Sequence, residues 1–463
     1  MKKFVIFSLI AVVVAGMAFA QLADGITVNA WGRGVFAPLV VAGAPMDGDG
    51  NKLKDANGDD LEAKVYTGSN ATWGGDDGAP RVDFRINGAT DYAGFTVQTN
   101  SETGGVGSGD AGANLWVQPF GSAALKLQVG NHFMNDTLRG KVATDTGFEN
   151  FVLNPINEDA IFNRFASGGK GPWENSTWLF ETNSFFLSSA PMDGLFIGLM
   201  LSGTMWAPAN GSYYEYNDDD EFEYATGITE AKDVFRFMHI GAGYEIEGIG
   251  HIRAQWIGGW MGTEKDATDK KYVAFTNWDG GGNTWNGGGG PARIEAAFAL
   301  TAVENLLVDL GAKIWMPTTF NNKDKASCGI DIGLGATFNA DAFGIAASVT
   351  LTDLGAYYKA DDIDDKYKAG MSLGINLIPT YDLDFGTLGL SLGLKMTASD
   401  KFGSDSVDND TMQLGFGGFF KKGLAGGSFK AGLAYMLAPL NHDKKAEGSG
   451  VFSIPIILEY AFF

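Results

Sequence analysis

The sequence predicts an all-β chain that folds as one antiparallel, up-and-down barrel of about eighteen strands, with sixteen as the alternative count. Two observations predict this fold class. Apolar and polar residues alternate with period two from residue 25 onward, and sustained helical periodicity is missing. The segments that alternate are also joined by short and long connections in turn. The length of 463 residues alone would suggest about three domains, but one large all-β barrel is a known exception.

The alternation is clear in 388–396, where Leu388, Leu390 and Leu392 alternate with glycine and serine. Successive strand side chains point to opposite faces, so each such segment has one apolar and one polar face. Eighteen segments of this kind lie at 26–37, 81–88, 93–100, 113–119, 124–131, 176–189, 195–202, 234–244, 250–260, 291–300, 306–316, 327–338, 343–352, 368–377, 383–397, 411–420, 428–436 and 451–462.

The connections sort by length. Short ones include 88–92, 120–123, 190–194 and 339–342, and Pro191-Met192-Asp193-Gly194 is a turn sequence. The long ones lie at 42–80, 101–112, 132–175, 203–233, 261–290, 317–326, 353–367, 398–410 and 437–450. A barrel in an outer membrane has short periplasmic turns and long extracellular loops, and this order predicts such a barrel. A water-soluble β-sandwich, the alternative, has no reason to sort its loops.

The first twenty residues predict a secretory signal peptide. Lys2 and Lys3 precede an apolar run, and Ala18-Phe19-Ala20 is a cleavage pattern before Gln21. The domain organisation is therefore a signal peptide at 1–20 and one transmembrane barrel at 21–463. No later stretch approaches the ~18 apolar residues of a membrane helix. The apolar strand faces suit lipid, and Trp256, Tyr244 and Tyr435 suit its interfacial aromatic girdles.

Composition and motifs exclude several functions. The net charge of −22 argues against a nucleic-acid partner, and the single Cys328 argues against a disulfide scaffold. No enzyme motif is found and the four histidines lack metal-ligand spacing, so we expect no catalytic residue, no cofactor and no metal site. The stretches 47–51 and 55–60 loosely resemble calcium loops but lack the required glycine and glutamate, which favours solvated loop surface over weak divalent-ion binding.

Three segments resemble bacterial outer-membrane porins, including the porin-like major outer-membrane proteins of spirochaetes. Residues 27–34, which contain Trp31, Gly32 and Arg33, look like a first porin strand, and 116–130 is similar to a porin hairpin. The end, 453–463, resembles the terminal strand that barrel assembly machinery recognises, with Tyr460, Phe462 and Phe463 as the assembly signal. Phe463 is one residue beyond the apolar phase.

This resemblance implies a water-filled channel for passive diffusion of small hydrophilic solutes and ions, with a homotrimer as the implied assembly. Barrels of this size are too wide for their side chains to fill. The residues in phase with the lumen are nine basic and four acidic: Arg33, Arg81, Arg85, Lys126, Arg253, Arg293, Lys313, Lys395 and Lys430, and Asp83, Glu295, Asp309 and Asp331. A basic wall predicts mild anion preference, unless these residues pair with loop carboxylates and only brace the pore.

The third long connection, 132–175, is the longest. In porins the third loop narrows the lumen, so the resemblance makes this segment a constriction loop, with an exposed cap over the mouth as the alternative. Its charged candidates are Arg139, Lys141, Glu149, Glu158, Asp159 and Arg164. Trp31, Trp116 and Trp315 share the lumen phase, and an aromatic track for sugars is weighed there against ordinary packing.

The acidity is concentrated in the long connections, which hold 40 acidic and 18 basic residues. The rest of the chain after the signal peptide is nearly neutral. The sequence thus predicts a negative extracellular mouth above a more positive channel. Two alternative functions use the same features: a surface adhesin or receptor acting through the acidic loops, and a sugar-selective porin.

Overall fold

The computed structural model describes most of the strands and part of the connections. The described residues are 25–47, 49–68, 81–102, 112–122, 124–130, 184–201, 212–216, 222–226, 238–257, 264–265, 272–273, 292–316, 329–354, 357–359, 366–368, 371–398, 411–437, 440–441 and 450–462. The predicted signal peptide at 1–20 and the predicted constriction loop at 132–175 lie outside them.

Eighteen strands of the described residues form one closed ring. In order they are β1 (Ile26–Ala42), β3 (Arg81–Ala89), β4 (Ala93–Glu102), β5 (Gly112–Val117), β6 (Lys126–Gly130), β7 (Ser184–Met192), β8 (Leu195–Leu201), β11 (Met238–Ile246), β12 (Gly250–Ile257), β15 (Ala292–Leu300), β16 (Leu306–Met316), β17 (Gly329–Ala340), β18 (Phe343–Leu354), β21 (Met371–Leu383), β22 (Gly386–Ala398), β23 (Thr411–Leu424), β24 (Gly427–Met436) and β26 (Val451–Phe462).

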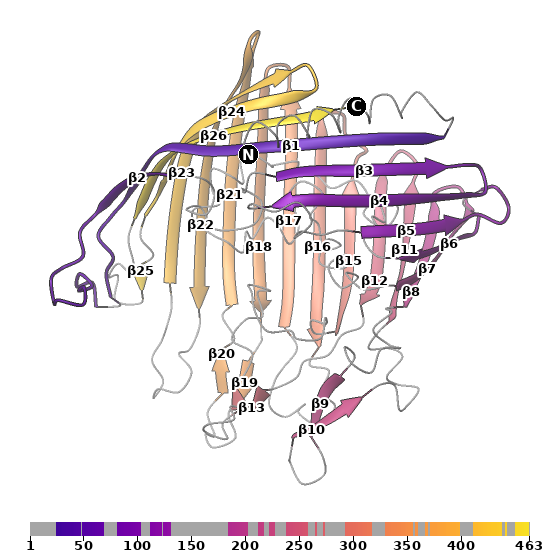
Figure 1. Ribbon diagram of the computed structural model, residues 1–463, viewed down its shortest axis with the longest axis horizontal. Helices are drawn as coiled ribbons and strands as arrows, with labels where there is room; N and C mark the ends of the chain where they lie inside the picture. The colour runs from indigo at the N-terminus through magenta and orange to yellow at the C-terminus, as the bar shows by residue number, and fades with distance from the viewer. Residues whose placement is uncertain are drawn as a thin grey trace, which may run out of the picture.

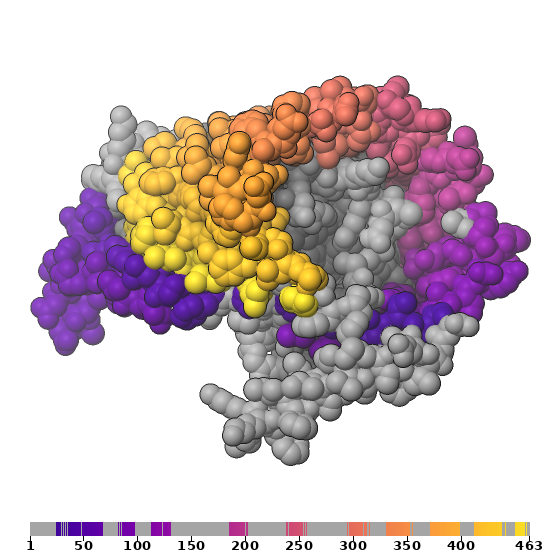
Figure 2. Space-filling view, turned by 90° about the horizontal axis from the view of Figure 1, so that it is seen from above, coloured from indigo at the N-terminus to yellow at the C-terminus, as the bar shows by residue number. Residues whose placement is uncertain are grey.

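Each of these strands pairs antiparallel with the next in that order. The last strand, β26, pairs with β1 and closes the ring. Figure 1 shows β1 and β3 to β5 crossing in front of β15 to β18. Figure 2 shows the colours passing around the ring until the yellow C-terminal strands lie beside the indigo N-terminal strand. The predicted all-β antiparallel barrel is confirmed.

The connections alternate in length as predicted. The links on one rim have two to eight residues, from the two-residue turn between β7 and β8 to the segment between β5 and β6. The links on the other rim are longer, up to the 53 residues between β6 and β7. The turn predicted at 190–194 is shorter than expected, because β7 continues to Met192 and Gly194 turns the chain with a φ of 76°.

The long connections contain short strands that the sequence pattern did not reveal. β2 (Lys64–Gly68) pairs with the end of β1, and β25 (Leu440–Asn441) pairs with β23. Three separate hairpins are β9 (Ser212–Tyr216) with β10 (Phe222–Thr226), β13 (Glu264–Lys265) with β14 (Tyr272–Val273), and β19 (Tyr357–Lys359) with β20 (Lys366–Lys368). Segments of two to five residues are too short for a period to be recognised.

β1 extends beyond its predicted end at residue 37. Its register shifts between Ala37 and Val40, at a point where Pro38 has no N–H to donate to a neighbouring strand. A bulge inserts a residue and moves the later side chains to the other face, which interrupts the alternation in the sequence. Beyond the bulge, β1 keeps β26 on one side and takes β2 on the other.

The two faces of the sheet differ as the alternation predicts. On β22 the apolar Leu388, Leu390 and Leu392 are exposed, whereas Gly389 and Ser391 between them are buried. The same alternation runs through β21 and β17. Apolar side chains therefore cover the outside of the ring, and small or polar ones dominate the inside. The described part of the chain contains no helix that is long and apolar enough to cross a membrane.

One sector of the inside is packed with apolar side chains, which the alternation of apolar and polar residues in the sequence does not predict. The cluster joins β1, β21, β23, β24 and β26. Its members, buried to 4% exposure or less, are Ala37, Val40, Ile378, Phe419, Ala434 and Ile457. These residues stand at the positions that alternate with the outward ones, so this sector has apolar residues on both faces. The polar interior is thus not uniform around the ring.

Candidate pore wall

The first candidate group is a row of charged positions across β26, β1, β3 and β4. Arg33 stands opposite Glu459 on one side and opposite Arg81 on the other. Arg81 in turn stands opposite Glu102. Directly opposed residues of an antiparallel pair have their Cβ atoms about 5 Å apart. The register therefore brings two arginine positions together and places a glutamate position at each end of the row.

The same strands carry further polar positions nearer the short-turn rim. Asp83 stands between Trp31 and Asn100, and Arg85 stands between Asn29 and Gln98. Arg33 lies far from Arg81 and Arg85 in the sequence. The pairing of β1 with β3 brings the three positions onto two neighbouring strands. The alternation in the sequence predicts that each of these residues faces the lumen. Only the strand register shows that their positions are neighbours.

A second row crosses β12, β15, β16 and β17. Gln255 stands opposite Glu295, Glu295 opposite Lys313, and Lys313 opposite Asp331. Charges of opposite sign therefore alternate along this row. Asp331 is fully buried, with 0% exposure. A buried carboxylate needs a compensating partner, and Lys313 holds the directly opposed position. The remaining predicted positions of these strands are Arg253, Arg293, Asp309 and Trp315; Arg293 stands opposite Trp315.

Trp116 and Lys126 meet at the short-turn rim. The Lys126 Nζ atom lies 4.7 Å from the centre of the Trp116 ring, within the range of a cation–π contact. The ring also covers Gly94 on the neighbouring strand, because a Cβ atom added there would lie 2.5 Å from it. Trp116 is therefore held between a glycine and a lysine. Lys126 is one of the predicted wall residues and Trp116 belongs to the predicted aromatic track, so the contact joins two groups that the sequence places apart.

Three predicted lysine and aspartate positions are more enclosed than an open pore wall requires. Lys430 is 7% exposed and stands opposite Lys421 and Ile457. Lys395 is half-buried and stands opposite Gln413 and Gly374. Together with the buried Asp331, these residues differ from the exposed positions expected of groups that line a channel. Their role in the pore stays a prediction.

Sequence reasoning missed a group of buried hydroxyls on the inner wall. Among the described residues, Ser348, Thr350, Ser391 and Ser453 each bury a hydroxyl that has no hydrogen-bond partner within the protein. Buried hydroxyls usually have such a partner. Isolated serines and threonines in alternating segments give no signal of this kind. The inner wall therefore carries neutral hydrogen-bonding groups besides its charges.

The acidic stretches of the first connection form two turns. The Asp47 carboxylate accepts hydrogen bonds from the N–H groups of Asp49 and Asn51 at 2.9 and 2.8 Å. The Asp55 carboxylate accepts them from Asn57 and Asp59 at 2.8 and 3.0 Å. The bonds from Asp59 and Asn57 stabilise the ionised carboxylate and lower the pKa of Asp55. In the described ranges, no group of three or more metal-ligating side chains converges.

Other predicted residues are placed only in part. Tyr460 and Phe462 stand opposite Gly32 and Ala30, so the predicted assembly signal forms the seam with β1. The constriction candidates Arg139, Lys141, Glu149, Glu158, Asp159 and Arg164 lie outside the described residues, as does Phe463.

A closed antiparallel ring with an apolar outside and a largely polar inside is the architecture of a membrane-spanning β-barrel. Closure pairs the backbone groups of every strand, which hydrocarbon requires. Apolar side chains then face lipid. The pairing of the strands and the exposure of their apolar side chains place this chain in the class of membrane-spanning β-barrels.

Comparison with known proteins gives distant structural similarities. The chain is similar to an anion-selective porin from Comamonas acidovorans, with 12% identity, a TM-score of 0.41, and coverage of 94% of this chain and 100% of that one. It is also similar to the outer membrane channel DcaP of Acinetobacter baumannii, with 9% identity, a TM-score of 0.43, and coverage of 95% and 98%. OmpT of Vibrio cholerae matches with 11% identity, a TM-score of 0.39, and coverage of 95% and 99%. No protein-family model and no curated protein matches the sequence.

Proposed function

We propose that this protein is an outer-membrane porin that lets small hydrophilic solutes and ions diffuse passively through the barrel. The closed ring of eighteen described strands carries this proposal, because a ring of that size encloses more space than its side chains fill. The separation of short and long connections supports an orientation with short turns in the periplasm and long loops outside.

Conductance of the purified protein in a planar lipid bilayer tests the proposal. A porin inserts in steps, and each step adds an ohmic conductance. Protein that has folded into barrels, judged by heat-resistant migration in a gel, provides the matched sample. Folded barrels that insert without any conductance would overturn the proposal and favour the adhesin or receptor alternative.

We further propose that the channel prefers anions weakly. Two observations support this preference: β1 and β3 carry Arg33, Arg81 and Arg85 against the single Asp83, and nine of the thirteen predicted wall residues are basic. Like charges in a narrow passage favour the entry of ions of opposite sign. The long acidic connections act in the opposite sense at the mouth, so the preference is small.

The contact between Trp116 and Lys126 bears on the sugar-selective alternative. Aromatic faces can stack on sugar rings, but this ring is already packed over Gly94 and beside a lysine ammonium. A structural role in the wall explains both contacts. Block of the open current by maltose-series sugars would support the sugar-selective alternative instead.

A further inference from the structure

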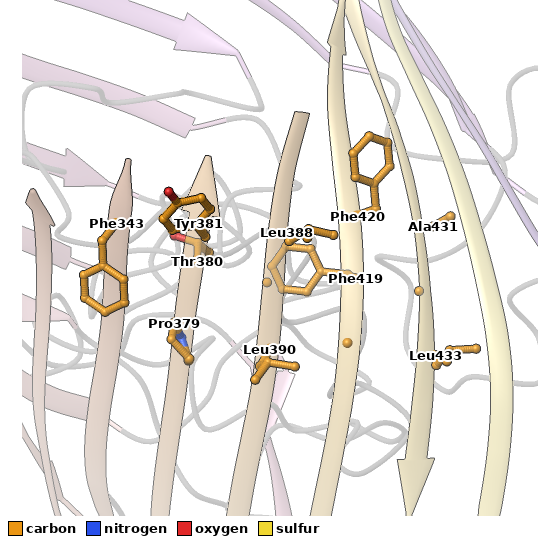
Figure 3. Close-up of a pocket in the computed structure, with 13 residues that line it drawn as sticks. Phe343, Pro379, Thr380, Tyr381, Leu388, Leu390, Phe419, Phe420, Ala431 and Leu433 are labelled. Atoms are coloured by element: carbon orange, nitrogen blue, oxygen red, sulfur yellow. The ribbon is translucent and has the colours of Figure 1, made fainter. Parts of the chain in front are cut away.

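An apolar groove lies on the outer surface of the barrel at the short-turn rim. It has a volume of about 770 Å³ and spans four neighbouring strands, β21, β22, β23 and β24, with Phe343 of β18 at its edge. Its walls are the side chains of Tyr381, Leu388, Leu390 and Leu433, which are about half exposed (Figure 3). Nearly all of the lining is apolar.

Small residues make the floor of the groove. Gly418 stands opposite Leu390 on one side and opposite Leu433 on the other, so a gap separates these two leucines. Pro379 and Ala431 also line the groove (Figure 3). A Cβ atom added to Gly418 would find its nearest neighbours at 3.7 and 3.8 Å, which is ordinary contact. The depression is thus open space that a larger side chain could occupy without backbone strain.

Charged side chains stand at the rim directly beyond the apolar walls. Lys422 is exposed and follows Phe420 by two residues on β23, so both lie on the outer face. Asp384 is exposed in the turn between β21 and β22. Its neighbour Phe385 packs against Phe420 with ring centres 5.9 Å apart. One positive and one negative side chain are therefore both exposed at the short-turn rim of the strands that form the groove.

We propose that this groove is a specific site for one ethanolamine glycerophospholipid. An acyl chain would fill the space over Gly418, the phosphate would bind Lys422, and the ammonium would bind Asp384. The pattern of one positive and one negative group matches this headgroup, and the apolar groove matches its chain. The inference rests on the proposed membrane location, since lipid must surround the outer wall.

Native mass spectrometry of delipidated, full-length protein titrated with dioleoylphosphatidylethanolamine tests the site. We expect wild-type protein to bind one lipid per chain more tightly than further lipids. Gly418→Leu fills the groove and should abolish this binding, while Gly34→Leu, at an outer position with no atom within 4 Å, should retain it. Lys422→Glu should weaken binding about tenfold, because a charge-assisted contact to phosphate is lost. Lys54→Glu is the matched control in the first long connection.

Two results would overturn the proposal. In the first, Gly418→Leu binds the lipid as wild type does; if this variant also dissociates an oligomer on size exclusion, the groove belongs to a contact with a second copy of the chain. In the second, dioleoylglycerol, which lacks the headgroup, binds as tightly as the phospholipid.

Conductance of the same variants separates this proposal from the proposed function. Gly418 and Lys422 lie on the outer face, so their variants should conduct as wild type does. A variant that loses lipid binding but conducts as wild type does shows that the groove binds lipid independently of conduction. Absence of conductance in wild-type protein would contradict the porin proposal and leave the lipid site untouched.

Discussion

At the scale of single residues, glycines and aromatic rings fit together across neighbouring strands. The Phe419 ring lies over Gly389, the Phe95 ring over Gly88, and the Trp116 ring over Gly94. In all three pairs the two residues are directly opposed on neighbouring strands. A ring laid over a glycine shields exposed backbone and restores apolar contact that the glycine lacks. High glycine content and high aromatic content are therefore linked in this wall.

Replacing Gly389 by alanine tests this packing. The added Cβ atom would overlap with the Phe419 ring, so the ring or the strand must move. We expect a loss of about 1–3 kcal/mol in the free energy of unfolding. Urea unfolding followed by tryptophan fluorescence measures it. Gly34→Ala, which adds a Cβ atom in open space, is the control and should cost far less; equal costs would contradict the packing argument.

At the scale of elements, the seam between β1 and β26 decides whether the sheet is closed. β26 lies between β24 and β1, and eleven residue pairs join it to β1 on either side of the register shift. An open sheet would leave unpaired backbone groups at both edges, which hydrocarbon cannot satisfy. The predicted assembly signal at Tyr460 and Phe462 is part of this seam, so the same residues that end the chain also close the barrel.

A disulfide across the seam tests its register. Gly34 and Leu458 are directly opposed, within the Cα separation that a disulfide allows. In a Cys328→Ser background, the double variant Gly34→Cys and Leu458→Cys should crosslink on oxidation and migrate faster in a non-reducing gel. Gly34→Cys with Phe452→Cys is the control, because Phe452 stands opposite Val41. Crosslinking in the control alone would show that the register is different.

At the scale of the whole molecule, charge is distributed between the rims and the wall. The long connections hold most of the acidic excess, and the strands are nearly neutral. The strand register then concentrates arginine positions on β1 and β3 and alternates opposite charges across β15, β16 and β17. Part of the wall is therefore electrostatically biased and part is balanced.

Neutralising the biased part tests the selectivity proposal. Arg33→Ala combined with Arg81→Ala removes two adjacent positive charges and leaves the glutamate positions of the row. We expect the anion-to-cation permeability ratio to fall severalfold, as measured by the zero-current potential across a salt gradient. Lys313→Ala with Glu295→Ala, which removes one charge of each sign, is the matched control. An unchanged ratio in the arginine variant would contradict an arginine contribution to selectivity.

The alternation in the sequence predicts the eighteen strands of the ring and the order of its short and long connections, but not the short strands within the long connections. These features are local, because a period of two and a turn are visible within about ten residues. The bulge at Pro38, the buried hydroxyls, the apolar sector around Phe419 and the outer groove over Gly418 were decided by the tertiary structure. Each depends on the register between strands, which brings together residues far apart in the chain. A glycine in the sequence does not reveal whether a ring covers it, as at Gly389, or a groove opens above it, as at Gly418, because its neighbours come from other strands.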